Sequence, residues 1–294
     1  MNVSDVTEKV INIINPAAGK GAGKITPPEG EIYWTKGPGD AEVYINELCR
    51  TSPVPLHLYI WGGDGTLSEA VNGVMSSGRA DNVKLSVVPI GTGNDFVRAF
   101  EKGSGEHIVD VMKVNGRYAV NAANTGFDCQ AVVHTSEMKK KPLISGSLAY
   151  GLGVAQTLLG KLGEDMTVSY TDENGNTDTI SGSMMLCVVS NAPYYGGGFK
   201  PGALAKYDDG LLDMMIVPKI TRLQFISLVG DYKAGRHLDP ETGTVAEKFK
   251  KIIRYHRIKS VKIEGISYKC LDGEVTPDSE MNVEVVPKAL RVVF

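Results

Sequence analysis

Trp61 to Glu69 reads WGGDGTLSE, and this stretch decides the fold of the first half of the chain. It follows the apolar run Leu56 to Ile60, which predicts a central strand, and leads into LSEAVNGVM, whose apolar residues recur at helical spacing. Gly62, Gly63 and Gly65 let backbone N–H groups approach an anion, and the start of a helix favours negative charge. The stretch therefore predicts a strand-to-helix turn that binds phosphate.

Asp64 is the unusual residue of this turn. A carboxylate repels a phosphate unless a cation lies between them, so Asp64 indicates Mg²⁺ bound together with a nucleotide. Thr66 is placed to cap the helix that follows. A tight turn in which Asp64 serves only as a turn former is the alternative.

Two further turns repeat this arrangement of strand, glycines and polar residues. The strand Val10 to Asn15 leads into PAAGKGAGK, which is one residue short of a P-loop and has Ile25 in place of its Ser or Thr. The strand Leu85 to Ile90 leads into GTGNDFVRAF. Because turns after successive strands of a β/α alternation share the carboxyl edge of a parallel sheet, we expect all three at one edge, where such folds bind ligands. For the first turn, a plain surface loop is the alternative.

Composition limits the classes of function. With 294 residues, 42% hydrophobic and 22% charged, the chain has the composition of a globular protein with room for two domains. A net charge of −3 argues against nucleic acid as a partner. Four cysteines without paired spacing, and no signal peptide, predict a cytoplasmic protein. The uncharged segment Pro142 to Gly160 contains too many glycines and polar residues for a transmembrane span, and we interpret it as a buried or interfacial helix.

The pattern changes after Gly103, where short strands and turn signals replace the alternation of strand and helix. Hairpin turns are predicted at Asn115 to Arg117 and at Glu173 to Asn176, and RYAVNAAN reads as a single strand. Two helices are expected in this half, at about Ser145 to Leu159 and Arg222 to Ala234. We therefore predict a parallel α/β domain at 1–122, to which 285–294 return, and a β-rich antiparallel domain at 123–284.

Six motifs in order resemble those of one known family. They are NPAAG, GGDGTLSE, GTGNDF, NTGFDCQAV, NAPYYGGGFKPGALAKYDDGLLD and LDGE. Together they resemble the diacylglycerol kinase catalytic domain family, which includes bacterial lipid kinases and the sphingosine and ceramide kinases. The resemblance implies an N-terminal nucleotide-binding α/β domain and a C-terminal antiparallel β-sandwich that binds the lipid.

The resemblance also implies roles for individual residues. Asp64 would bind the Mg²⁺ of the nucleotide, and Asp209, with main-chain oxygens of Lys206 and Leu211, would bind a structural metal. Glu274 would be the general base, with Asp272 as the second choice. The residues implied for ATP are Asn15, Pro16, Gly19, Thr35, Gly62, Gly63, Asp64, Gly65, Thr66, Glu69, Gly91, Thr92, Gly93, Asn94 and Asp95.

These expectations define an ATP- and Mg²⁺-dependent kinase that phosphorylates a lipid alcohol at the membrane surface. The alternatives are an NAD kinase, which shares GGDGT, and a non-catalytic lipid-binding or nucleotide-binding module. The alternative for LDGE is a solvated hairpin turn, and the alternative for the DDG site is a turn without a metal. The basic tract Lys248 to Lys262 is either a docking site for anionic lipid headgroups or a solvated face. Exposed strand edges also allow a homodimer.

Overall fold

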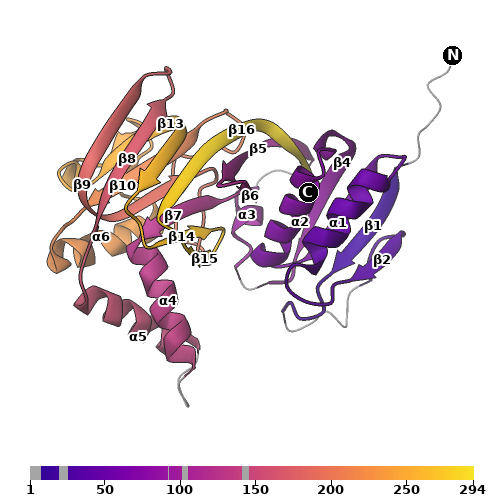
Figure 1. Ribbon diagram of the computed structural model, residues 1–294, viewed down its shortest axis with the longest axis horizontal. Coiled ribbons are helices and arrows are strands. Elements are labelled where there is room, and N and C mark those ends of the chain that lie inside the picture. The colour runs from indigo at the N-terminus through magenta and orange to yellow at the C-terminus, as the bar shows by residue number, and fades with distance from the viewer. Residues whose placement is uncertain (1–7, 20–25, 92, 101–104, 141–145) are drawn as a thin grey trace.

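A computed structural model describes residues 8–19, 26–91, 93–100, 105–140 and 146–294. Its two halves lie side by side and are joined by a long strand (Figure 1). Strands β1, β2, β3 and β4 of the first half are parallel, in the order β4-β3-β1-β2. The elements of this half are β1 (Lys9–Ile14), β2 (Glu31–Trp34), α1 (Asp40–Thr51), β3 (Leu56–Gly62), α2 (Asp64–Ser76), η2 (Ala80–Asn82), β4 (Val83–Pro89) and α3 (Asp95–Arg98).

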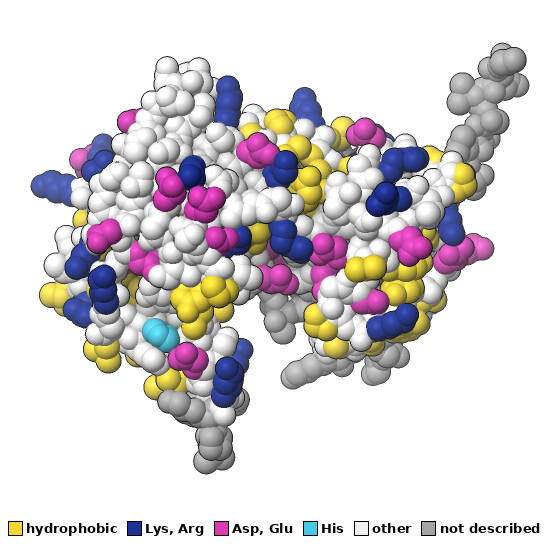
Figure 2. Space-filling view, in the orientation of Figure 1, with side chains coloured by type: hydrophobic (Ala, Val, Ile, Leu, Met, Phe, Trp, Pro, Cys, Tyr) yellow, Lys and Arg dark blue, Asp and Glu magenta, His cyan; other side chains and the backbone are white. Residues whose placement is uncertain are grey.

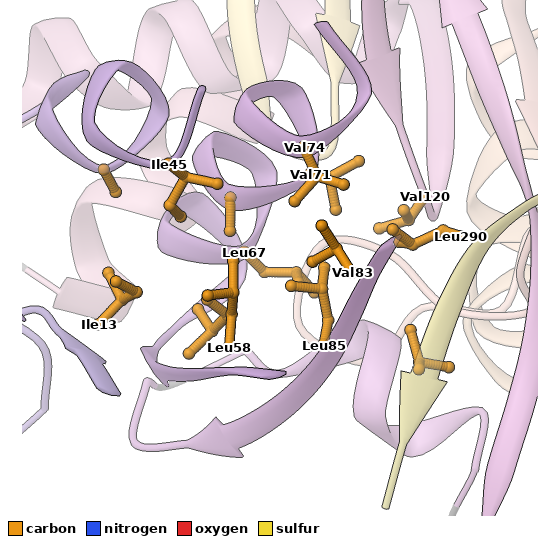
Figure 3. Packing of buried hydrophobic residues seen from close by; sticks show 14 of the residues in the cluster. Ile13, Ile45, Leu58, Leu67, Val71, Val74, Val83, Leu85, Val120 and Leu290 are labelled. Atoms are coloured by element: carbon orange, nitrogen blue, oxygen red, sulfur yellow. The ribbon is translucent and has the colours of Figure 1, made fainter. Parts of the chain in front are cut away.

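The core of the first half lies between this sheet and helices α1 and α2 (Figure 3). Ile13, Leu58 and Leu85 project from neighbouring strands, and Ile45 of α1 and Val71 of α2 cover them. Each of these side chains is fully buried, and burying one contributes about 1.5–3 kcal/mol. This packing fixes the strand ends at which the predicted turns begin.

The second half is built mainly from antiparallel strands. It contains β5 (Glu106–Val114), β6 (Arg117–Ala119), β7 (Ala122–Gly126), α4 (Phe127–Lys139), α5 (Gly146–Leu159), β8 (Glu164–Asp172), β9 (Thr177–Ser190), β10 (Leu212–Pro218), α6 (Arg222–Ala234), β11 (Leu238–Asp239), β12 (Thr244–Val245), η3 (Glu247–Phe249), β13 (Arg254–Glu264), β14 (Tyr268–Leu271), β15 (Glu274–Pro277) and β16 (Glu280–Val293). Two separate apolar clusters form its core. The predicted fold class, an α/β domain followed by an antiparallel β-sandwich-like domain, is confirmed.

Strand β16 connects the halves. Its first residues pair with β13, most of its length pairs antiparallel with β5, and Arg291–Val293 pair in parallel with Lys84–Ser86 of β4. The sheet consequently runs without a break from the second half to the first. The residue limits of the two domains stay a prediction.

Local predictions succeed where turn chemistry is strong. Asn115 and Gly116 both have positive φ, as a two-residue hairpin turn requires, and they join β5 to β6. The turn at Glu173 to Asn176 joins β8 to β9, and the two predicted helices are present as α5 and α6.

In the second half, one predicted strand is wrong and one helix was missed. RYAVNAAN is not a single strand, because the N–H groups of Val120 and Asn121 donate to the carboxylate of Asp272 and interrupt the ladder between β6 and β7. Helix α4 was not predicted. It follows Gly126, whose φ of 95° permits an abrupt change of direction, and at which a Cβ would lie 2.4 Å from Met185 O.

Candidate active site

The three glycine turns meet at the carboxyl edge of the parallel sheet, as predicted. A Cβ on Gly91 would lie 2.5 Å from Gly63 Cα, so the second and third turns touch through backbone. Gly19, with φ of +65°, would place a Cβ 2.1 Å from Ile90 O, which brings the first turn against the third. Glycine is required at these positions because any side chain would separate the turns.

Asn15 and Thr66 connect the first two turns. Asn15 Nδ2 donates to Thr66 Oγ1 at 2.9 Å, and Asn15 Oδ1 accepts from Ala17 N. The prediction that Thr66 caps α2 is wrong, because the helix already begins at Asp64 with Gly63 at its N-cap. The Thr66 hydroxyl instead holds the first turn against the second, and a Cβ on Gly62 would collide with the Thr66 side chain.

Asp64 faces the third turn. Its carboxylate oxygens accept from Asn94 N and Asp95 N, both at 2.8 Å, and a Cβ on Gly93 would lie 2.3 Å from Oδ2. The Asp95 carboxylate is 4% exposed and accepts from Gly197 N at 2.7 Å. Burial raises the pKa of Asp95, and the charge of Asp64 raises it further.

This pair of acids fits a cation. Arg98 Nη1 lies 3.4 Å from Asp95 Oδ1 and offsets part of the charge, but the effect of Asp64 on the pKa of Asp95 is larger than that of Arg98. A divalent ion would relieve the remaining repulsion, and each oxygen that accepts one N–H keeps a second lone pair. Gly65 beside Asp64 is exposed, with no atom within 4 Å of the position of a Cβ, so there is room next to the pair.

The remaining residues implied for ATP lie around this edge. Glu69 is engaged with the start of α1, where its carboxylate accepts from Gly39 N at 2.8 Å and Ala41 N at 3.2 Å. Thr35 is buried after β2, and Pro16 lies in the exposed first turn. Thr92 lies outside the described residues.

LDGE forms the two-residue turn between β14 and β15. Leu271 pairs with Glu274, and Asp272 and Gly273 have φ of 46° and 95°. The Asp272 carboxylate accepts from Val120 N, Asn121 N and Ala122 N at 2.8–3.0 Å. The hairpin is thereby fixed to the segment between β6 and β7.

The hairpin lies beside the glycine turns. Burial raises the pKa of Asp272 to about 6, and the charge of Asp64 contributes to the increase. Glu274 is exposed. The pKa of Arg117 is raised chiefly by its hydrogen bonds to Glu42. The charges of Glu274 and Glu69 raise it further. The structure thus brings Asp64 next to Asp95 and within electrostatic range of Asp272, and Glu274 follows Asp272 by two residues in the hairpin.

The DDG turn does not fit the implied structural metal. Arg257 Nη2 donates to Asp209 Oδ2, and Leu211 N donates to Asp209 Oδ1 at 3.1 Å. A cation at Asp209 would have to displace this guanidinium. The turn is also anchored by the buried Asp110, whose carboxylate accepts from Gly210 N at 2.6 Å. No sequence motif had indicated this residue.

Removing metal is therefore expected to leave the nucleotide-free protein unchanged in melting temperature, with EDTA and Mg²⁺ giving the same Tm by calorimetry. Arg257→Ala should lower stability by about 1 kcal/mol, because a partly exposed ion pair contributes little more. Arg254→Ala, an exposed arginine of the same strand, is the control. If EDTA lowered the Tm of the wild type, the hypothesis of a structural metal bound at Asp209 would be supported.

An apolar cavity of about 250 Å³ lies in the second half, between α4, α6 and the LDGE hairpin. Phe127, Leu186 and Phe225 contribute to its wall, and Gly273 of the hairpin borders it. Asp128 also lines it, and its carboxylate accepts from the Tyr195 hydroxyl. Nothing in the sequence marked this cavity, because its residues come from elements far apart along the chain.

Asp128 gives the stability of the fold a predictable pH dependence. Burial raises its pKa to about 6, above its value in the unfolded chain. The folded state then binds the proton more tightly than the unfolded chain does. The contribution of protonated Asp128 to the free energy of unfolding is therefore fully present below about pH 4 and is lost as the pH rises through 6. Between pH 4 and 7.5 the wild type should lose about 2–3 kcal/mol of its free energy of unfolding that Asp128→Asn does not lose, as measured by denaturant unfolding. The exposed Asp165→Asn is the control, and parallel curves for Asp128→Asn and wild type would contradict the assignment.

Comparison with known proteins gives one consistent result. Residues 9–124 match the family described as "Diacylglycerol kinase catalytic domain", and residues 121–294 match "YegS C-terminal NAD kinase beta sandwich-like domain". A "Putative lipid kinase" of Staphylococcus haemolyticus is 31% identical over 89% of this chain and 84% of its own length. A "Probable lipid kinase YegS-like" of Shewanella frigidimarina is 28% identical over 80% of this chain and 75% of its own. A crystal structure of "a putative diacylglycerol kinase" from Bacillus anthracis superposes with a TM-score of 0.70 at 25% identity, covering 98% of this chain and 97% of that one.

Proposed function

Because the chain belongs to the diacylglycerol kinase catalytic domain family, we propose that it is a lipid kinase that transfers the γ-phosphate of ATP to a lipid hydroxyl, with Mg²⁺. The observation that carries the proposal is the Asp64–Asp95 pair at the edge of the glycine turns, with the LDGE hairpin near enough for the charge of Asp64 to raise the pKa of Asp272. An acid pair beside glycine turns suits a metal-bound nucleotide, and a further acid beside it suits proton transfer.

The nucleotide would lie along the turns that follow β1, β3 and β4. Their exposed backbone and the N-terminus of α2 favour the phosphates. Asn15 and Thr66 keep the first two turns together, and Glu69 holds α1 in place beside them. Asp64, with Asp95 next to it, would hold the Mg²⁺. When bound, the ion supplies neutralisation of the phosphate charge that develops during transfer.

Glu274 is the better candidate for the general base. The Asp272 carboxylate already accepts three backbone N–H groups, so its role is to position the hairpin. Glu274 is exposed at the start of β15 and can accept the proton of the lipid hydroxyl as that oxygen bonds to phosphorus. Such assistance is typically worth about 10²–10⁴-fold in rate.

The apolar cavity would take part of the acyl chain of the substrate. Its wall is hydrophobic and it borders Gly273, the neighbour of Glu274, so a chain in the cavity would bring its headgroup toward the proposed base. Which lipid alcohol is used is left to experiment. A homodimer through an exposed strand edge stays a prediction.

The proposal is tested by incubating the protein with labelled ATP, Mg²⁺ and mixed micelles that contain several lipid alcohols, followed by organic extraction. We expect label in the organic phase, and its loss in EDTA. Label on added NAD, with none on any lipid, would support an NAD kinase. Neither product would support a binding module.

A further inference from the structure

Helix α5 buries small residues and exposes large apolar ones, whereas a helix that faces water exposes polar side chains. Ala149, Gly153 and Thr157 recur every four residues on its buried side. A Cβ on Gly153 would lie within 2.4–2.8 Å of atoms of Thr135 in α4, so the small residues allow α4 and α5 to pack closely. Leu148, Leu152 and Leu159 of α5 are directed outward, where a helix that faces water carries polar side chains. Val154 and Leu158 pack toward the core.

Six large apolar side chains of α5 and α6 are exposed, and we call them together the apolar outer face. Figure 2 shows hydrophobic side chains at the lower left of the molecule, where these helices lie. The six are Leu148 (56% exposed), Leu152 (38%), Leu159 (78%), Leu223 (80%), Ile226 (57%) and Val229 (37%). Arg222 joins the helices, because its guanidinium donates to Leu158 O at 2.7 Å and Gly160 O at 3.0 Å.

The charges around this face suit an anionic surface. Helix α5 contains no charged residue. Exposed lysines lie at the borders, with Lys161 just after α5, Lys219 shortly before α6, and Lys139 and Lys140 at the end of α4. No ion pair between these four lysines and an acid is found in the described part of the chain. An apolar stripe bordered by unpaired cations is the pattern of a segment that lies in a membrane interface.

The face is continuous with the apolar cavity. Val229 belongs to both, and Val132 of α4, 37% exposed, also lines the cavity. A surface that lay in the lipid would therefore open the cavity toward the acyl chains. No helix in the described part of the chain is long and apolar enough to cross a membrane.

The basic tract Lys248 to Lys262 lacks these properties. Its apolar residues Phe249 and Ile253 are buried, and several of its cations form ion pairs within the chain. These pairs are Lys248 with Asp231, Lys250 with Glu247, Arg257 with Asp209 and Lys262 with Glu264. This tract accordingly fits a solvated face.

We propose that the apolar outer face of α5 and α6 docks on an anionic lipid membrane, with Leu159 and Leu223 entering the interface and the lysines contacting headgroups. The opening of the cavity then faces the lipid from which the substrate comes. The role of this docking in substrate access rests on the proposed function, but membrane binding can be measured without catalysis.

The test is co-sedimentation with vesicles of phosphatidylcholine, with and without phosphatidylglycerol. We expect the wild type to bind the anionic vesicles, and Leu159→Ser/Leu223→Ser to bind them at least about tenfold more weakly. Val43→Ser, which changes an exposed residue of α1 (69%), should bind as the wild type does. Unchanged binding of the double variant, or an equal loss for Val43→Ser, would overturn the proposal.

Two further measurements separate this proposal from its neighbours. The double variant should keep wild-type activity on a dispersed short-chain lipid alcohol and lose it on vesicles. No lipid phosphorylation by the wild type in either form would refute the proposed function, while the sedimentation result would still decide the docking. Sedimentation velocity tests self-association. If the wild type is a dimer, the double variant is a monomer and vesicle binding is unchanged, the face mediates self-association and the proposal is overturned.

Discussion

Glu274→Gln is expected to lose turnover by about 10²–10⁴-fold while ATP affinity stays near that of the wild type. The side chain is exposed in the hairpin and contributes to no buried core, so the fold should not change. The amide is the same size but cannot take the proton of the attacking hydroxyl. Rates with labelled ATP and lipid micelles, together with nucleotide titration by calorimetry, measure both quantities.

The control for this variant is Glu47→Gln, the same change of charge at an exposed position on α1. It should leave both turnover and affinity unchanged. Turnover of Glu274→Gln close to that of the wild type would remove the base from Glu274. A larger effect on ATP affinity than on turnover would instead place Glu274 at the nucleotide.

Asp64→Asn is the second change with a large expected effect. Its carboxylate accepts from Asn94 N and Asp95 N, and it is also the proposed ligand of Mg²⁺. The amide retains one acceptor, presents an N–H₂ group to the third turn and loses the charge. We expect kcat/KM to fall by at least about 10²-fold, as for the loss of one preorganised electrostatic contact in an active site.

Mg²⁺ dependence identifies the cause of this loss. If Asp64 binds the ion, the variant should need a much higher Mg²⁺ concentration for half-maximal rate, in addition to any fall in Tm caused by the lost hydrogen bond to the third turn. Asp81→Asn, an exposed acid of η2, is the control. A fall in Tm with an unchanged Mg²⁺ requirement would mean that Asp64 acts only as the clamp of the third turn.

The sequence predicted the nucleotide edge well because its signals are local. Each glycine turn directly follows an apolar strand, and parallel strands end at one edge, so the proximity of Gly63 and Gly91 follows from the order of elements. The hairpin turns are similarly local, since positive φ at Asn115 and Gly116 is a property of those residues.

Features that depend on distant partners were not predicted. Asp272 anchors the hairpin through amides of Val120, Asn121 and Ala122, which lie about half the chain away in the sequence. Those bonds divide the strand that RYAVNAAN suggested. Helix α4 was missed because β-branched Val132 and Val133 weaken its helical signal, and tertiary packing outweighs that propensity.

The outward leucines of α5 show a different limit. The sequence indicates a helix without charge but leaves open whether it is buried or interfacial. The decision comes from Gly153, because its contact with Thr135 fixes which side of the helix is inside.

The measurement that tests the account most directly is the stoichiometry of products from one reaction of the wild-type protein with ATP, Mg²⁺ and a lipid alcohol. Mass spectrometry of the organic phase and quantification of ADP in the aqueous phase give the two amounts. We predict one lipid phosphomonoester for each ADP, with both formed at least about 10²-fold more slowly by Glu274→Gln. ADP without a phosphorylated lipid, across a panel of lipid alcohols, would contradict the assignment.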